Sequence, residues 1–274
     1  MGKKQLIEGF QGRFNQIIVN LKSWKFSEWV LFFFLIPLLL YLIFLLPQNI
    51  KDNYLVFNTS ELLKVQTFLL NEYTHSTFDH ILGNVKFYLI AIIAIFAFEN
   101  NKQRFWIMAS CAFLLVPVIA AFLTVFFWDS INRNTVSQGF SGIAAALSAY
   151  AIMIFLFWAM HDAMPVFNQS IKITDRRFFG YILMCVLVAV FFALVISFGL
   201  QLGSFFGGGN VVSNGIAHFG GFITGLIILL LYDLIPENRN LNFDVIFGLS
   251  IIIGIYAYIP YLQKLIDIIK NSGG

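Results

Sequence analysis

Seven runs of mostly apolar residues, each about as long as a membrane-spanning helix, divide the chain. A helix that crosses a bilayer needs about 20 such residues, because each residue adds only about 1.5 Å to its length. With 59% hydrophobic residues and a mean hydropathy of +0.82, the chain does not fit a water-soluble globule. We therefore expect an all-α polytopic membrane protein, whose runs are Trp29–Leu46, Ile81–Phe98, Phe105–Trp128, Ser141–Met160, Phe178–Leu200, Gly215–Leu234 and Phe243–Leu262.

These runs suggest a simple domain organisation. Residues 1–28 are polar and basic, and no small-residue cleavage site follows the first run, which predicts a cytoplasmic segment followed by a retained helix. Residues 29–234 hold the first six runs and form the predicted core. Residues 235–274 supply a loop, a seventh helix and a short tail.

The distribution of lysine and arginine between the runs predicts the orientation, since cytoplasmic loops carry the excess. With the N-terminus inside, the cytoplasmic segments hold eleven of these residues: Lys3, Lys4, Arg13, Lys22, Lys25, Lys102, Arg104, Lys172, Arg176, Arg177 and Arg239. The outer segments hold five: Lys51, Lys64, Arg133, Lys264 and Lys270. The N-terminus is therefore expected inside and the C-terminus outside. The net charge of +3 reflects topology, and no basic patch with interleaved aromatic residues indicates nucleic-acid binding.

This topology makes runs two, four and six all begin near the outer surface, and each begins with polar residues. Run two opens with HILGN at residues 80–84, run four with GFSG at 139–142, and run six with GIAHFGGFITG at 215–225. Polar side chains are costly in hydrocarbon and tend to face the interior of a bundle or a water-filled cavity. We therefore expect them to meet at one depth and to form a site.

The chemistry of these residues favours acyl transfer. A serine hydroxyl becomes nucleophilic when a base takes its proton, and Ser141 with His218 provides such a pair. An oxyanion needs aimed donors, which His80, Asn84 and the free N–H groups around Ser141 could supply. The apolar runs offer no obvious carboxylate partner for the histidine, so we expect a catalytic dyad and no triad.

Small residues should let the two helices that carry this pair approach closely. Gly221 and Gly225 follow His218 at i+3 and i+7, and Gly142, with the alanines after it, makes a matching face on run four. Gly139 and Gly142 flank the serine segment. We expect these four glycines to support the packing that brings Ser141 and His218 into hydrogen-bonding distance.

Together these motifs resemble those of the rhomboid intramembrane serine proteases. HILGN on the second helix is similar to the family's HxxxN motif, GFSG on the fourth to its GxSG motif, and AHFGGFITG on the sixth to its AHxxGxxxG motif. The three motifs follow one another in the order found in the family. The resemblance implies a six-helix bundle plus one C-terminal helix, with Ser141 as nucleophile, His218 as general base and then acid, and His80, Asn84 and the Ser141 N–H at the oxyanion. It also implies a structural role for His75, a lid role for the glycine-rich segment Gly199–Asn214, and no metal or cofactor.

Two other functions remain open from the sequence. A rhomboid-like protein without activity could bind transmembrane segments as a scaffold, and a small-solute transporter is a less favoured alternative because no inverted repeat is present. The expected partners are single-span membrane-protein substrates and membrane lipid. A prokaryotic cell membrane is the expected location.

Overall fold

The structure, a computed structural model, describes residues 15–61, 64, 66–130, 136–163 and 212–233. This part of the chain is mostly helical, as the apolar runs predicted. The predicted fifth helix (Phe178–Leu200), the predicted seventh helix (Phe243–Leu262) and residues 199–211 of the predicted lid lie outside the described residues.

Helices coincide with five of the predicted runs. The first is one continuous helix made of α2 (Phe26–Val30), the π-helical turn η1 (Leu31–Leu35) and α3 (Ile36–Phe44), and it follows a short helix at residues 15–23. The others are α6 (Phe78–Phe98), α7 (Lys102–Ser130), α8 (Ser141–Ala163) and α10 (Val212–Asp233).

By length and composition, three of these helices can cross a membrane. They are Phe26–Phe44, Phe78–Phe98 and Lys102–Phe126, and α8 and α10 contribute shorter apolar segments, Ser141–Phe155 and Ala217–Leu229. The described residues are thus those of an all-α membrane protein.

Three helices begin earlier than hydropathy predicted, because their first turns are polar. The Thr77 side chain accepts a hydrogen bond from the backbone N–H of His80 and so starts α6 at Phe78 instead of Ile81. The Asn101 side chain accepts from Arg104 N–H in the same way, and α7 starts at Lys102 instead of Phe105. Helix α10 starts at Val212 instead of Gly215. Residues 212–214, the last three of the segment Gly199–Asn214, therefore belong to a helix, and the prediction that they are part of a loop is wrong.

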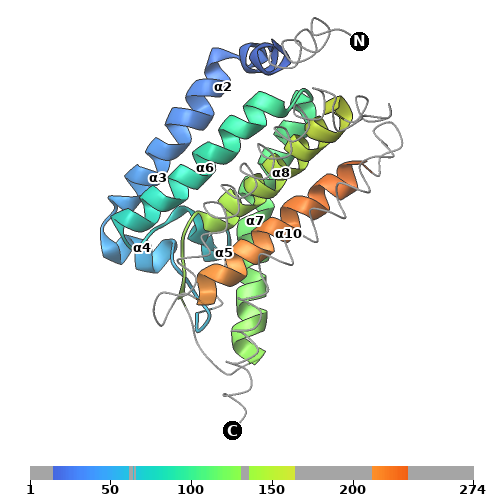
Figure 1. Ribbon diagram of the computed structural model, residues 1–274. Helices are drawn as coiled ribbons and strands as arrows, with labels where there is room; N and C mark the ends of the chain where they lie inside the picture. The colour runs from blue at the N-terminus through green and yellow to red at the C-terminus, as the bar shows by residue number, and fades with distance from the viewer. Residues whose placement is uncertain (1–14, 62–63, 65, 131–135, 164–211, 234–274) are drawn as a thin grey trace, which may run out of the picture.

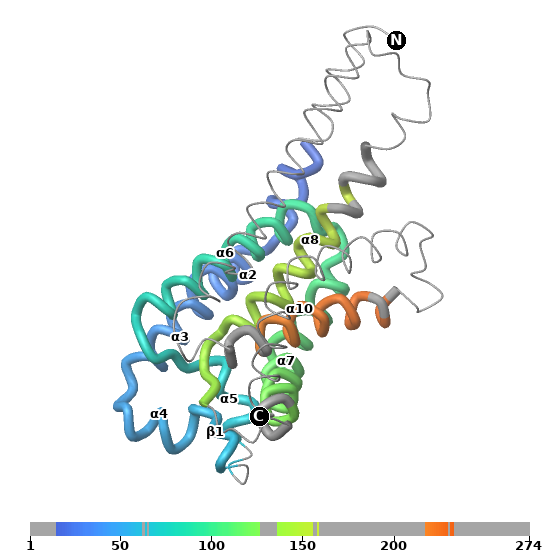
Figure 2. The backbone as a smooth tube through the Cα atoms, turned by 60° about the horizontal axis from the view of Figure 1, so that its bottom comes forward, coloured from blue at the N-terminus to red at the C-terminus, as the bar shows by residue number. Residues whose placement is uncertain are grey.

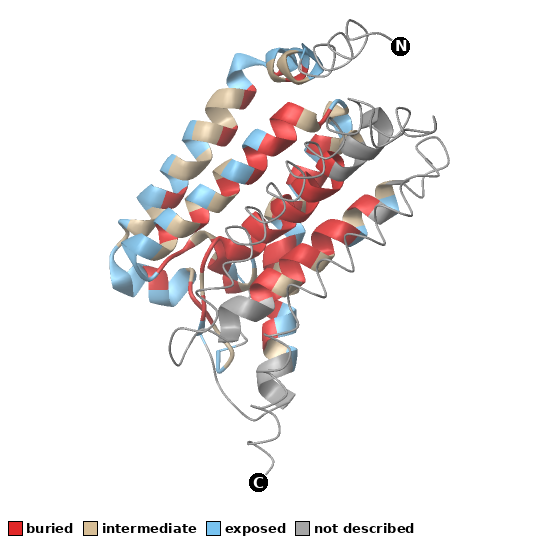
Figure 3. Cartoon of the chain, in the orientation of Figure 1, coloured by how far each residue is buried: buried red, intermediate tan, exposed pale blue. Residues whose placement is uncertain are grey.

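The helices are arranged with α8 at the centre of the bundle (Figures 1 and 2). It packs between α6 and α10, while α7 crosses behind them and contacts both α8 and α10. Residues 141–155 of α8 are buried throughout, as the continuous red ribbon in Figure 3 shows. The α2–α3 helix lies at the edge of the row (Figure 1), and it exposes large apolar side chains such as Phe34 and Leu42 that suit contact with lipid.

The segment between α3 and α6 folds into short elements at the end of the bundle where α8 begins. They are α4 (Gln48–Tyr54), β1 (Phe57–Asn58), α5 (Gln66–Leu70) and the 3₁₀ turn η2 (Asn71–Tyr73). Strand β1 pairs antiparallel with β2 (Val136–Ser137), with Phe57 opposite Ser137. This segment is therefore tied to the residues that lead into α8.

At the other end, a buried ion pair joins three helices. Arg104 of α7 donates two hydrogen bonds, each of 2.9 Å, to the carboxylate of Glu99 at the end of α6, and the Tyr150 hydroxyl of α8 donates to the same carboxylate. Asn101 reaches the Tyr232 hydroxyl of α10 at 3.3 Å. These contacts join α6, α7, α8 and α10. They lie at the level of Tyr150, about 13 Å along α8 from Ser141 at about 1.5 Å per residue.

Candidate active site

The segment before α8 takes a backbone conformation that only glycine adopts easily. Gly139 has φ +129°, and a Cβ built there would lie 2.7 Å from His80 Cε1 and 3.5 Å from Asn84 Nδ2. Both side chains come from the first two turns of α6. The structure thus brings together Gly139, His80 and Asn84, three of the residues singled out in the sequence.

Residues 71–75, which we call the strap, bind the backbone on both sides of Ser141. The Asn71 carbonyl accepts from Gly139 N–H at 3.1 Å, and His75 Nε2 accepts from Phe140 N–H at 3.2 Å. A Glu72 carboxyl oxygen accepts from Gly142 N–H at 2.8 Å. The first N–H groups of a helix lack intrahelical partners, so the strap supplies acceptors that the helix itself cannot.

The Ser141 N–H stands between these engaged groups and makes no hydrogen bond to any described residue. The sequence predicted free N–H groups around Ser141 in general. The structure leaves fewer N–H groups available, because those of Phe140 and Gly142, on either side of Ser141, donate to His75 and Glu72. The open donor is the one that belongs to the predicted nucleophile.

The strap also orients Asn84. The amide nitrogen of Asn84 lies 2.9 Å from His75 Nε2, which already accepts from Phe140 N–H. We infer that Nε2 is unprotonated and that Asn84 donates to it, which leaves the second amide hydrogen of Asn84 available. Burial, with contributions from His80 and Lys51, lowers the pKa of His75 to about 3, so this imidazole is neutral at physiological pH.

The backbones of α8 and α10 touch at their glycines. A Cβ built at Gly221 would lie 2.0 Å from the Gly142 carbonyl oxygen, and one at Gly225 would lie 2.7 Å from the Ala146 oxygen. Gly142 in turn leaves room for the Ala217 carbonyl, which would be 3.2 Å from a Cβ there. Close contact of this kind between small residues is a usual way for membrane helices to pack.

This packing places the two residues of the predicted dyad, Ser141 and His218, on turns of α8 and α10 that lie next to each other. Ser141 is 5% exposed and His218 is 4% exposed, and they adjoin Gly142 and Ala217, whose backbones are in contact. Within the described residues, however, the Ser141 hydroxyl makes no hydrogen bond, so the expected bond to His218 is not formed. Catalytic hydrogen bonds are often long in a free enzyme, and the dyad stays a prediction.

Glu72 is a residue of this site that sequence reasoning missed. It is 1% exposed, and burial raises the pKa of its carboxyl to about 8, although the N–H groups of Gly142 and Ile143 partly offset this effect. The apolar runs suggested no carboxylate near the site, and Glu72 lies outside them. It acts on the helix backbone, 70 residues away in the sequence, so no local motif could have identified it.

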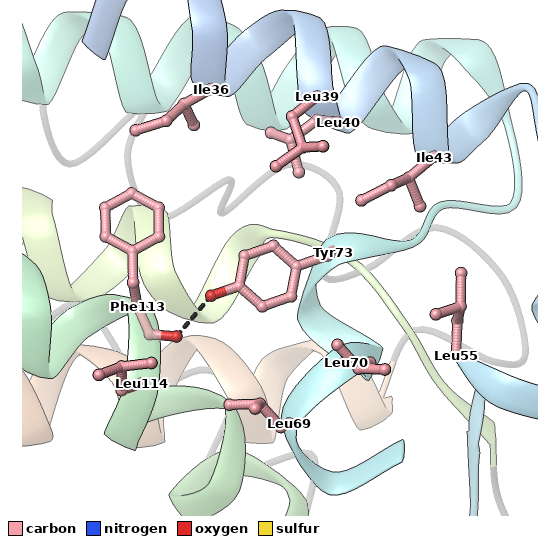
Figure 4. Close-up of a pocket in the computed structure, with 10 residues that line it drawn as sticks. All are labelled: Ile36, Leu39, Leu40, Ile43, Leu55, Leu69, Leu70, Tyr73, Phe113 and Leu114. Carbon is pink, nitrogen blue, oxygen red and sulfur yellow. Dashed lines mark hydrogen bonds between the residues drawn. The ribbon is translucent and has the colours of Figure 1, made fainter. Parts of the chain in front are cut away.

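An apolar cavity of about 420 Å³ lies beside the strap, between α3, α5 and α7 (Figure 4). Tyr73 lines it, and its hydroxyl donates to the Phe113 carbonyl of α7. The cavity is lined by none of Ser141, His218, His80 and Asn84. It is therefore separate from the candidate site.

Among the described residues, no group of three or more His, Cys, Asp or Glu side chains is placed to hold a metal ion. Comparison of the chain with family models, curated proteins and solved structures found no match.

Proposed function

We propose that this protein is an intramembrane serine endopeptidase of the rhomboid type, with a bundle of six helices plus one. One observation carries the proposal. The Ser141 N–H, at the first residue of a buried helix, has no acceptor among the described residues, while the flanking N–H groups are bound and the side chains of His80 and Asn84 lie against Gly139. An unengaged N–H with side-chain donors nearby is what an oxyanion requires.

In the proposed reaction, His218 takes the proton of the Ser141 hydroxyl as its oxygen attacks the carbonyl carbon of a substrate peptide bond. The negative charge that develops on the carbonyl oxygen is stabilised by the Ser141 N–H, the free amide hydrogen of Asn84 and His80. The C–N bond then breaks, and His218 returns the proton to the departing amine. Water then attacks the acyl-serine ester while His218 takes one of its protons. The bond between the carbonyl carbon and the Ser141 oxygen breaks, and His218 returns the proton to Ser141.

The substrate would be a single transmembrane helix that unwinds locally, since a helical peptide bond has its carbonyl engaged. The excess of lysine and arginine in the segments assigned to the cytoplasm supports a cytoplasmic N-terminus and a site near the outer face of the membrane. A prokaryotic cell membrane remains our proposed location. Segment 199–211 is the proposed lid.

A second candidate is a scaffold that binds transmembrane segments without cleaving them. It is favoured by one observation, that the Ser141 hydroxyl makes no hydrogen bond among the described residues. A transporter has no comparable observation in its favour.

Cleavage assays separate these functions. Purified protein is incubated in proteoliposomes with several single-span reporter substrates, alongside Ser141→Ala and His218→Ala. We expect cleavage by the wild type and none above background by either variant. If the wild type binds the reporters but cleaves none, the scaffold is the better account.

A further inference from the structure

Glu72 stands at the start of α8, held in place by the residues on either side of it. The Asn71 amide donates to the Thr67 and Phe68 carbonyls of α5, each at 2.9 Å, and Tyr73 is bound to α7 through its hydroxyl. The Glu72 side chain therefore has little freedom to leave Gly142. Its neighbours in the strap bind residues before the serine, whereas Glu72 binds the residue after it.

We propose that Glu72 is a positioning residue for the acyl-transfer site, which fixes the first turn of α8 and leaves the Ser141 N–H as the open donor. The inference rests on the proposed function, because positioning this N–H matters only if an oxyanion forms there. The geometry that supports it is the 2.8 Å bond to Gly142 N–H and the position of that group directly after Ser141.

The protonation state of Glu72 should then affect the reaction. The raised pKa, about 8, means that the carboxyl is mostly neutral at pH 7 and accepts hydrogen bonds without carrying a charge. Above that pH the carboxylate would still hold Gly142, but it would place a full negative charge at the positive end of α8. That charge opposes the negative charge developing on the substrate oxygen, so the reaction should slow.

Other ionisable groups on the surrounding elements must be considered. The titratable side chain of Tyr73 is kept neutral by burial, which raises its pKa, and His75 is neutral because its pKa is lowered. Segment α5 and the first two turns of α8 carry no ionisable side chain. The surrounding elements also carry other ionisable side chains, among them Lys51, Asp52 and Tyr54 of α4, Glu61 and Lys64 before α5, Asp79, His80 and Lys86 of α6, Cys111 of α7 and His218 of α10.

The test is the rate at which a fluorophosphonate probe inactivates the protein in detergent micelles between pH 6 and 10. The probe forms a bond to an activated serine and develops charge on an oxygen in the oxyanion position. Wild type is compared with Glu72→Gln, which keeps an acceptor oxygen but cannot ionise. The matched control is Glu61→Gln, which removes an exposed carboxylate from the same inter-helix segment.

We expect Glu72→Gln to react within about threefold of wild type at pH 7. At pH 9.5, where a group with a pKa near 8 is almost fully ionised, the variant should react at least about tenfold faster than wild type. Glu61→Gln should follow the wild-type profile. Parallel profiles of wild type and Glu72→Gln would overturn the inference.

A second measurement keeps this inference distinct from the proposed function. If wild type does not react at any pH, the proposed function fails. Hydrogen exchange then tests the positioning alone: Glu72→Ala should speed exchange in the peptide covering residues 139–143, and unchanged exchange there would refute it. If Glu72→Ala does not fold, Glu72→Gln replaces it, and the comparison uses protection factors for residues 139–143, which correct for the intrinsic rise of exchange with pH. These factors should fall between pH 5 and pH 9 in wild type, as ionisation of Glu72 destabilises the protein, and stay constant in Glu72→Gln; equal changes in both proteins would refute the positioning role.

Discussion

The contact between Gly221 and Gly142 gives the sharpest mechanical prediction about the site. A Cβ at position 221 would lie 2.0 Å from the Gly142 carbonyl oxygen, a backbone atom that cannot rotate away. Because Cβ atoms essentially never come within 3.0 Å of another heavy atom, Gly221→Ala must move α8 and α10 apart by roughly 1 Å. Overpacking of this size costs about 1–3 kcal/mol.

The same displacement should also slow the chemistry. A shift of about 1 Å between reacting groups can cost about 100-fold in rate. We therefore expect Gly221→Ala to react with the fluorophosphonate about 100-fold more slowly than wild type. Its unfolding in mixed micelles of dodecyl maltoside and SDS, followed by circular dichroism, should occur at a lower SDS fraction.

Gly220→Ala is the matched control on the next residue of α10. Its Cβ would lie 2.7 Å from Leu123 Cδ1, the far end of a flexible side chain that can change rotamer. Both substitutions gain the same helix propensity, about 1 kcal/mol in favour of alanine, so their difference isolates the backbone clash. Wild-type stability and reactivity in Gly221→Ala, or a larger loss in Gly220→Ala, would refute the packing argument.

Three further predictions concern charge and backbone strain. The pKa of Glu72 is raised from 4.5 to about 8, so wild type should lose stability as the pH rises between these values, by about 5 kcal/mol at 1.36 kcal/mol per pH unit. Glu72→Gln cannot ionise and should lose none of this stability. Equal pH dependence of the two proteins in SDS unfolding would contradict the prediction. Gly139→Ala, at φ +129°, should cost about 1–3 kcal/mol and slow the probe reaction at least about tenfold by displacing His80; an unaffected rate would show that Gly139 is not needed. Glu99→Gln leaves Arg104 without its carboxylate partner and should destabilise the protein by about 3–5 kcal/mol. Glu99 contacts α8 through Tyr150, about 13 Å along the helix from Ser141, so the probe reaction of the folded fraction should change less than threefold. A larger change would indicate coupling between the two ends of the bundle.

Hydropathy and motif spacing predicted the elements that carry the candidate site. The apolar runs correspond to α6, α8 and α10, and the polar residues at their starts lie at one end of the described bundle. Helix starts were displaced by three residues at α6, α7 and α10, because polar first turns have no hydropathy signal. The π-helical turn η1 and the two-residue strands β1 and β2 were not predicted, since such short elements show no periodicity.

The strap could not have been predicted from the sequence for a different reason. Its bonds to Phe140 and Gly142 join residues 65 and 70 positions apart, and they depend on how a loop returns over the bundle. A glutamate in a loop is most often solvated, and nothing local marks Glu72 as buried. The role of Glu72 at the start of α8 therefore emerged only from the fold. For His75 a structural role was expected from the family resemblance, and the fold adds its bond to Phe140 N–H.

The central claim is that Ser141 is an activated nucleophile, and covalent labelling tests it most directly. Wild-type protein is treated with a fluorophosphonate, and the adduct is located by mass spectrometry of its peptides. Ser148, which is 3% exposed in the same helix, is the internal comparison, and His218→Ala is the variant without the proposed base. We predict one adduct, on Ser141, that is absent in His218→Ala; no adduct in wild type, or an equal adduct on Ser148, would contradict the account.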